Sequence, residues 1–328
     1  MSASENPLLT ISIPTYNRSV FLDRALKQLS IQLIDQDLPV EVVVSDNCST
    51  DDTESVVKKH IDNGLKLRYV RNPENKGMDF NIAQCYLLAK GQYVVAVGDD
   101  DFLLDGSLKL LTDFLQNKDY GVVYFKSKGF AEGATIDKVT AEKLSFTEFT
   151  EPIDFVKKVH YYITFISGNI VNTKYLDKDN MLKYLGTSLP QVPFFMNAVL
   201  SAKQNVVVDT VLLGVELDNT GGYNLFKVFG KNFNYILDGI QTSSKSLKDN
   251  IKAAINRKLL IGFFPDYILK FRLNNKNAFV HTDAIKELKE LYAGNFYFYM
   301  CCYPIAYLPK GLAKGYKQGV KLFSKLSS

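Results

Sequence analysis

The chain has 328 residues, of which 46% are hydrophobic, and its 39 Lys and Arg against 35 Asp and Glu give a net charge of +4. This length suffices for one large domain and a smaller one, and the ordinary composition excludes a disordered chain. Such a slight positive charge gives no reason to expect a nucleic-acid partner. Because no 18 consecutive residues are apolar, we also expect no membrane-spanning helix.

The cysteines and the N-terminus bear on the compartment. Cys48, Cys85, Cys301 and Cys302 have no metal-ligand spacing, and the last two are adjacent in sequence, which rarely suits a structural disulfide. Residues 1–7 are polar and short, unlike a signal peptide. We therefore expect a protein of the reducing cytoplasm.

The first 125 residues alternate short strand and helix patterns. Strand runs are predicted at 8–13, 40–44, 65–70, 93–97 and 121–125, and helical spacing at 20–33, 51–61, 77–89 and 107–115. Strands that alternate with helices of this length are typical of βαβ units. Their right-handed connections predict an α/β fold, a mostly parallel sheet with helices on both faces.

The pattern changes further along the chain. Residues 131–150 predict a loop or hairpin, followed by a helix at 152–162, an apolar segment at 163–171, a helix at 192–203 and strand runs at 206–208 and 211–215. Gly221-Gly222 marks a boundary, beyond which the sequence is helical to the end. This predicts a domain over residues 1–220 and a helical region over 221–328.

The strongest chemical signal follows the predicted strand at 93–97. Its apolar residues lead through Gly98 into three consecutive acids, Asp99, Asp100 and Asp101. Adjacent carboxylates repel one another unless a cation lies among them, and Mg²⁺ or Mn²⁺, which prefers oxygen ligands, would also hold phosphates there. The alternative is a solvated acidic turn.

Polar loops also follow the other predicted strands. They are residues 14–18 (Pro-Thr-Tyr-Asn-Arg), 45–52 and 71–77, the last leading into Asp79 and Asn81. All would meet at the carboxyl edge of the sheet, where nucleotides bind in such folds. Asp46 can accept a hydrogen bond from a base, Tyr16 can pack on a ring and Arg18 can reach a phosphate. Residues 49–51 also fit a helix N-cap, which explains them fully.

Together these motifs resemble a family of enzymes. Residues 13–18, 44–47, 75–77 and 98–101 (Gly-Asp-Asp-Asp) are similar, in this order, to the motifs of GT-A glycosyltransferases of family 2. The nearest type is the bacterial O-antigen and capsule sugar transferase, including abequosyltransferase-like enzymes. The resemblance is firm to residue 115, thins to residue 219 and is absent beyond it. It implies a GT-A fold and transfer of a sugar from a nucleotide-sugar, by default a UDP-sugar with CDP as an alternative, to a glycan acceptor.

The resemblance also implies roles for residues. The nucleotide-sugar would contact Pro14, Thr15, Tyr16, Arg18, Asp46, Asp79, Asn81 and Asp99, and Ser167 and Asn169 would meet the donor sugar or the acceptor unless they form only a turn between buried strands. The acid triplet corresponds to the metal-binding DxD element. The usual form, Asp-Ser-Asp-Asp, places Gly98 at the first acid, so Asp100 is the expected principal ligand of Mn²⁺ or Mg²⁺, with Asp101 beside it and Asp99 assisting.

The implied mechanism is direct displacement at the anomeric carbon, assisted by the metal and by a carboxylate that deprotonates the acceptor hydroxyl. The family usually carries this base about ninety residues past the metal site. Here that slot falls at 189–192, where Gln191 cannot serve as a base. Possible substitutes are Asp154, Asp177, Asp179, Asp209 and Glu216, and their spacing does not choose among them. A catalytically inactive scaffold that binds glycan or nucleotide is therefore the alternative, whereas a nucleotidyltransferase is disfavoured because the first loop is not glycine-rich.

The C-terminal region suggests a membrane surface. Aromatic residues are dense over 292–307, and the lysines that follow are Lys310, Lys314, Lys317, Lys321 and Lys325. On a helix these lysines fall within roughly 80°, opposite Leu312, Tyr316, Phe323 and Leu326. Residues 309–327 are therefore expected to contact the inner face of the cell membrane, near a lipid-linked acceptor. The alternatives are a packed helix with solvated lysines and an aromatic subunit interface.

Overall fold

The computed structural model describes residues 7–130, 138–177, 179, 182–216, 224–242, 244–273 and 284–326. The chain divides into two compact units. The first comprises Met1–Phe155 and Tyr162–Asp218, and the second comprises Val156–Tyr161 and Asn219–Ser328. The predicted domain boundary at residue 220 and the Gly221-Gly222 pair lie outside the described residues, so that boundary stays a prediction.

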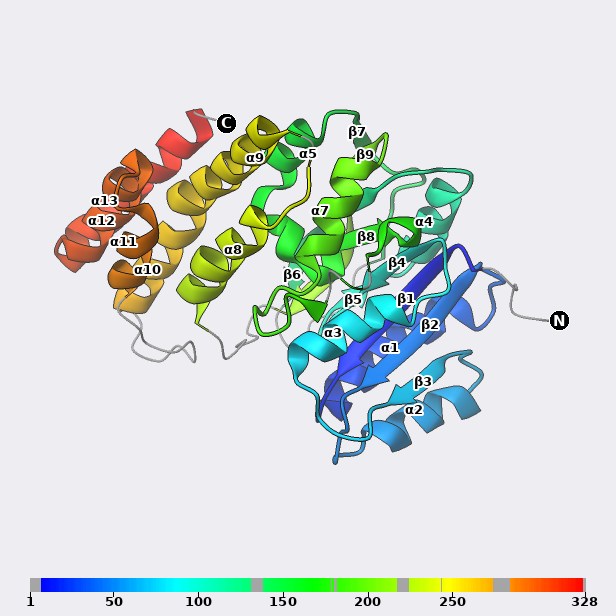
Figure 1. Ribbon diagram of the computed structural model, residues 1–328. Helices are drawn as coiled ribbons and strands as arrows, with labels where there is room; N and C mark the ends of the chain where they lie inside the picture. Colours follow the sequence, from blue (N-terminus) through cyan, green and yellow to red (C-terminus); the bar gives the residue numbers. More distant parts are fainter. Residues whose placement is uncertain are drawn as a thin grey trace. The chain divides into compact units, whose positions relative to one another are not determined.

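The first unit is built on a nine-stranded sheet within the described residues. Its four consecutive parallel strands are β1 (Leu9–Thr15), β2 (Val40–Asp46), β3 (Arg68–Arg71) and β4 (Tyr93–Ala96), in the order β3-β2-β1-β4 (Figure 1). The predicted α/β class is thereby confirmed. Strands β1, β2 and β4 are rich in β-branched residues and mostly buried, as parallel strands covered on both faces are.

The sheet continues with mixed directions beyond β4. The order runs on through β8 (Asn169–Asn172), β6 (Val122–Phe130), β9 (Asn205–Glu216) and β5 (Phe102–Leu103), while β7 (Phe146–Phe149) also pairs with β9. The two strand runs predicted at 206–208 and 211–215 form one strand, β9, with irregular register beside Lys126. Residues 138–150 contain β7, in line with the predicted hairpin or loop, and residues 131–137 lie outside the described chain.

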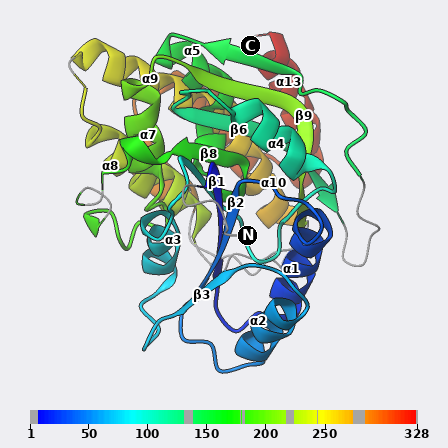
Figure 2. The same ribbon diagram turned by 90° about the vertical axis from the view of Figure 1, so that its right-hand side faces the viewer.

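Helices cover both faces of this sheet (Figure 2). One face carries α1 (Ser19–Leu33), α2 (Thr53–Asp62) and α4 (Ser107–Leu115), and the other carries α3 (Met78–Leu87) and α7 (Val192–Ser201). The buried stripe of α1, with Leu22, Leu26 and Leu29, has the expected helical spacing. The segment predicted as one helix at 152–162 is α5 (Pro152–Val159) followed by a 3₁₀ turn, His160–Thr164.

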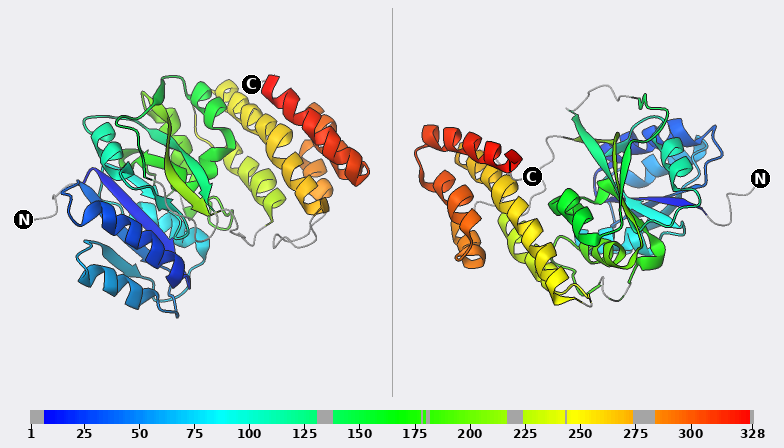
Figure 3. Two further views of the ribbon diagram at one scale, coloured as in Figure 1. Left: turned by 180° about the vertical axis from the view of Figure 1, so that it is seen from behind. Right: turned by 90° about the horizontal axis from the view of Figure 1, so that it is seen from above.

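The second unit is helical throughout the residues that the structure describes, as predicted (Figure 3). Its helices are α8 (Phe233–Asp238), α9 (Lys245–Lys258), α10 (Phe264–Leu273), α11 (Ala284–Tyr292), α12 (Tyr303–Tyr307) and α13 (Lys310–Leu326). Three π-helical segments, Lys227–Asn232, Leu259–Phe263 and Phe298–Cys302, join them. Across the described part of the chain, every helix is too short or too polar to cross a membrane.

Candidate active site

The predicted site lies where β1, β2 and β4 end. Thr15 and Asp46 are register partners at the last positions of β1 and β2. Asn81 of α3 ties these ends together, because its side-chain amide donates to the carbonyls of Ser45 (2.9 Å) and Thr15 (3.3 Å). Its Oδ1 accepts a hydrogen bond from the Ser45 hydroxyl at 2.7 Å. Asn81, predicted to line the donor pocket, thus joins the two strands at this edge.

We call residues 98–101, between β4 and β5, the acid turn. Asp99, Asp100 and Asp101 are 5%, 7% and 6% exposed, so the alternative of a solvated turn is wrong. Two hydroxyl groups hold the carboxylates in place. Thr15 donates to Asp99 Oδ2 at 2.8 Å, and Ser167 donates to Asp101 Oδ2 at 2.6 Å while its oxygen accepts the amide of Gly98 at 2.9 Å.

Steric crowding explains why the first residue of the acid turn, Gly98, is a glycine. A Cβ atom at Gly98 would lie 2.9 Å from Asp100 Oδ1 and 3.3 Å from Asp101 Oδ2. An acid at this position, as in the usual family form, therefore does not fit unless the neighbouring carboxylates move. The crowding of the carboxylates therefore explains why this chain has glycine at position 98, where the usual motif has an acid.

Two arginines contact the acid turn, Arg18 directly before α1 and Arg24 within it. The Arg18 guanidinium lies between two carboxylates, with Nη2 2.8 Å from Asp100 Oδ2 and Nε 3.2 Å from Asp99 Oδ1. Arg24 donates to the backbone carbonyl of Asp100 at 3.2 Å and pairs with Glu216 at the end of β9. One guanidinium thus faces the carboxylates, whereas the charge of the other is matched by Glu216.

The electrostatics of the acid turn favour an additional cation. Burial raises the pKa of Asp99 to about 7 against the opposing charge of Arg18, and repulsion from Asp100 adds to the rise. Burial, followed by repulsion from Asp100, likewise raises the pKa of Asp101 to about 7. A carboxylate with a raised pKa is one whose negative charge the surroundings do not fully balance.

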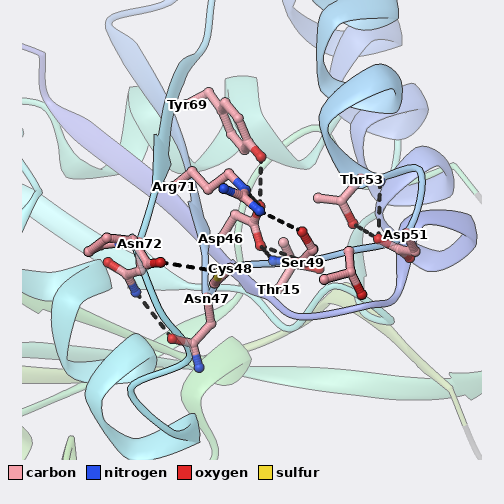
Figure 4. A network of polar contacts seen from close by, with 12 residues as sticks. Thr15, Asp46, Asn47, Cys48, Ser49, Asp51, Thr53, Tyr69, Arg71 and Asn72 are labelled. Atoms are coloured by element: carbon pink, nitrogen blue, oxygen red, sulfur yellow. Dashed lines mark hydrogen bonds and ion pairs between the residues drawn. The ribbon is translucent and has the colours of Figure 1, made fainter.

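The second acidic position, Asp46, lies in a network of its own (Figure 4). It is fully buried, and its Oδ1 accepts hydrogen bonds from the amide of Ser49 (2.9 Å) and its hydroxyl (2.5 Å). The Tyr69 hydroxyl donates to Oδ2 at 2.6 Å, and Arg71 Nε lies 3.6 Å from the same oxygen. Burial and the hydrogen bond to Asp46 raise the pKa of Tyr69 well above its usual range. Both side-chain oxygens of Asp46 therefore already have partners within the protein.

The other predicted donor-site residues differ in exposure. Tyr16 is 42% exposed, and Pro14 is half-buried in β1. Asp79, in the first turn of α3, accepts the amides of Gly186 (2.7 Å) and Ser188 (2.9 Å) with Oδ2. It therefore fixes the loop that leads towards α7, which begins beside the expected position of the base.

A family model covers the segment that contains the acid turn, the Asp46 network and Ser167. The contacts from β9 and from the loop before α7 lie beyond it. Glycosyl transferase family 2 matches residues 10–171, about half of the chain. Residues 10–171 are a glycosyltransferase domain of family 2.

Curated relatives match about a third of the chain. The abequosyltransferase RfbV of Salmonella typhimurium is 36% identical over 112 residues, which are 34% of this chain and 33% of that protein. A Campylobacter jejuni β-1,3-glucosyltransferase, named for the acceptor GalNAc(5)-diNAcBac-PP-undecaprenol, is 38% identical over 106 residues, 32% of this chain and 33% of that protein. The match thus spans about a third of the length of these relatives.

Solved structures match over nearly the whole chain and agree with the GT-A expectation. Residues 1–349 of Staphylococcus aureus TarS, crystallised with UDP, have a TM-score of 0.59 at 18% identity, covering 98% of this chain and 92% of that one. The mannosyltransferase PcManGT of Pyrobaculum calidifontis, crystallised with GDP-Man and Mn²⁺, has a TM-score of 0.51 at 16% identity, covering 98% and 88%. At such identities the likeness concerns the fold.

The expected position of the family's base is occupied by Gln191, directly before α7. Gln191 is 2% exposed and donates from Nε2 to the carbonyl of Thr164 at 2.5 Å. Its Oε1 is buried without a hydrogen-bond partner among the described residues. Of the five acids considered as substitutes, Glu216 contacts the acid turn, through Arg24.

Ser167 and Asn169, both predicted to meet the donor sugar or the acceptor, have different contacts in the structure. Ser167 reaches the acid turn, as described above. Asn169 is fully buried and donates to the carbonyls of Phe165 (2.7 Å) and Tyr162 (3.0 Å), closing its own turn. The structure therefore brings Ser167 to the predicted metal site and uses Asn169 to hold the turn that carries it.

The residues of the acid turn fit a divalent cation that also binds phosphate. Among the described residues no group of three or more His, Cys, Asp or Glu side chains is arranged to hold a metal ion by itself. Mg²⁺ usually takes only one or two carboxylates from the protein and the remaining ligands from water and substrate phosphates. The buried carboxylates of Asp99, Asp100 and Asp101, two of which have raised pKa values, are suited to this arrangement.

Three residues of this site carry no signal in the sequence pattern that places them there. Tyr69 lies on β3, where alternation gives its face but not its contact with Asp46. Arg24 follows Arg18 by six residues, so helical spacing alone places the two on different faces of α1. The sequence suggests Glu216 only as a possible base, and its pairing with Arg24 depends on a contact between residues 192 positions apart.

Proposed function

We propose that this protein transfers a sugar from a nucleoside-diphosphate sugar to a glycan acceptor, with a divalent cation at the acid turn. The observation that carries the proposal is the buried acid turn, which lies within a family-2 domain at the same sheet edge as the Asp46 network. UDP is the first candidate nucleotide because TarS was crystallised with UDP and with UDP-GlcNAc.

The residues have the following proposed roles. Asp46 accepts a hydrogen bond from the nucleotide, and Tyr16, exposed at the edge, packs on its base. Asp100 and Asp101 hold Mn²⁺ or Mg²⁺, which when bound neutralises charge on the departing diphosphate. Thr15 fixes Asp99 and Ser167 fixes Asp101, so that these two carboxylates require no reorganisation when the donor arrives.

The acceptor is proposed to be a lipid-linked glycan, as in O-antigen or capsule synthesis. Support comes from the Campylobacter relative, whose name specifies an undecaprenol-linked acceptor, and from the naming of RfbV as an abequosyltransferase. Such an acceptor would place the protein at the inner face of the membrane.

Residues 309–327 are the proposed membrane contact, and residue 327 lies outside the described chain. Exposed Lys310, Lys314 and Lys321 of α13 accompany exposed Leu312 and Phe323, 63% and 43% accessible. Two residues of the predicted amphipathic pattern contact other parts of the helical unit instead. Tyr316 donates to the carbonyl of Met300, and Lys317 pairs with Asp266.

Vesicle sedimentation tests this contact. Wild-type protein should sediment with phosphatidylglycerol vesicles and not with neutral phosphatidylcholine vesicles, and changing Lys310, Lys314 and Lys321 to Glu should abolish the binding. The same change at exposed Lys27, Lys58 and Lys66 of the first unit is the control. Equal binding by both triple variants would exclude α13 as the contact.

A thermal-shift screen tests the donor. UDP, CDP, GDP and TDP are each compared with Mn²⁺ and with EDTA, because a ligand at 100 times its Kd stabilises the native state by about 2.7 kcal/mol. One nucleotide should raise the melting temperature in a metal-dependent manner. Asp100→Ala should lose the shift, whereas Asp113→Ala, which removes an exposed acid of α4, should keep it.

The alternative is a catalytically inactive GT-A scaffold, favoured by Gln191 at the position of the base. Such a scaffold would bind a nucleotide without cleaving the corresponding nucleotide-sugar. Release of nucleoside diphosphate from any nucleotide-sugar, lost in Asp100→Ala, would exclude it. The absence of any nucleotide shift from folded protein would exclude the transferase.

A further inference from the structure

Arg18 occupies the position that a cation needs at the acid turn. It is the residue directly before α1, and its guanidinium contacts Asp99 and Asp100 while stacking 4.4 Å from the ring centre of Phe21. Both carboxylates are almost fully buried, but the Arg18 side chain is 33% exposed. The guanidinium therefore closes the outer side of the acid turn and can leave it towards solvent.

A divalent cation bound to Asp100 Oδ2 would compete with Arg18 for that oxygen. Asp100 Oδ2 receives Arg18 Nη2 at 2.8 Å, whereas a bound Mg²⁺ lies about 2.0–2.1 Å from each ligand oxygen. Two cations at these distances from one oxygen repel each other strongly. Arg24 is not in this competition, because it contacts the backbone carbonyl of Asp100 and is paired with Glu216.

We propose that Arg18 is the resident counter-ion of the acid turn, that an incoming divalent cation displaces it from Asp100, and that it then contacts the diphosphate of the donor. This inference rests on the proposed function. Metal alone must break the ion pair, whereas metal with a nucleoside diphosphate gives Arg18 a new anionic partner. Arg18 thus couples the two ligands, and each should tighten the binding of the other.

The test measures Mn²⁺ affinity by electron paramagnetic resonance, without and with UDP. Arg18→Gln removes the competing charge, so we expect it to bind Mn²⁺ alone about tenfold more tightly than wild type. UDP should strengthen Mn²⁺ binding in wild type and do so much less in Arg18→Gln. Damage to the fold would weaken Mn²⁺ binding, which is the opposite change.

Two further variants complete the design. Lys27→Gln removes an exposed cation of the same helix and should leave Mn²⁺ affinity unchanged. Arg18→Lys keeps the positive charge but cannot contact Asp99 and Asp100 in the way that the guanidinium does. It should bind Mn²⁺ with an affinity between those of wild type and Arg18→Gln. This variant replaces Arg18→Gln in the test if Arg18→Gln does not fold.

The outcomes separate this inference from the function on which it rests. Unchanged or weaker Mn²⁺ binding by both Arg18 variants overturns the inference and leaves metal-assisted transfer standing. UDP binding with no Mn²⁺ binding in any variant also overturns it, because the acid turn then takes no metal. If neither UDP, CDP, GDP, TDP nor Mn²⁺ binds, the proposed function itself fails.

Discussion

At the scale of single residues, the acids at the sheet edge are balanced in different ways. Asp46 receives three hydrogen bonds from neutral hydroxyl and amide groups, whereas Asp99 and Asp100 share a guanidinium. The sequence predicts that these acids meet at one edge, since strand ends are readable from β-branched runs. It does not predict that Arg18 contacts the carboxylates rather than a phosphate, because that contact joins loops 82 residues apart.

Tyr69→Phe tests the support of Asp46. The change removes one donor from a buried carboxylate, and hydrogen bonds to charged groups contribute about 1.5–3 kcal/mol. We expect the free energy of unfolding in urea to fall by about that amount. Tyr16→Phe, at an exposed tyrosine, should leave it unchanged, and an equal loss in both variants would contradict the assignment.

His160 predicts a dependence of stability on pH. Burial, with a smaller contribution from the charge of Lys258, lowers the pKa of His160 from 6.5 to about 4. As the pH falls from 6.5 to 4, His160 therefore becomes protonated in the unfolded chain but stays neutral in the native protein. Stability is lost over this window, by about 3.5 kcal/mol at 1.4 kcal/mol per pKa unit.

Urea unfolding at pH 7 and pH 4.5 measures this loss. His160 has a φ of 45°, a left-handed conformation that Asn tolerates, so His160→Asn removes the titration at little cost in backbone strain. The variant should lose less stability between the two pH values than wild type does. Equal losses would mean that His160 is not the group responsible.

At the scale of elements, the predictable parts are those whose pattern is local. The helix predicted at 107–115 is α4 with the same bounds, and the run at 40–44 is the core of β2. The two-residue strand β5 was missed because it exists only through pairing with β9, Phe102 against Gly214. No local pattern in Phe102–Leu103 could reveal a partner more than a hundred residues away.

This pairing leads to a prediction about two glycines. A Cβ at Gly214 would lie 2.3 Å from the Phe102 ring, whereas one at Gly319, in α13, meets nothing within 4 Å. Gly214→Ala should lower the free energy of unfolding by about 1–3 kcal/mol through overpacking. Gly319→Ala should raise it by about 0.5–1 kcal/mol, because alanine is the better helix former.

Urea unfolding of the two variants gives the comparison. Phe102 directly follows the acid turn, so the Gly214 variant should also lose the Mn²⁺-dependent nucleotide shift. A stable Gly214→Ala protein that keeps this shift would show that β5 does not hold the acid turn.

At the scale of the whole molecule, the two units are not consecutive along the chain. Val156–Tyr161 belong to the helical unit although both flanking segments belong to the first. The sequence predicts a helix at 152–162 from its spacing but not which core receives it. Val156 and Val159 are each 1% exposed, and the ring of Tyr161 lies 5.3 Å from that of Phe263.

The chain therefore passes from one unit to the other three times, and a single cut cannot separate them. If a protease cleaves within 217–223, the first fragment still supplies Val156–Tyr161 to the helical unit. We expect the two fragments to elute together in native buffer and to separate only in denaturant. Two genes divided at this position should then yield a protein that assembles from its halves, and separate elution of the halves would contradict this expectation.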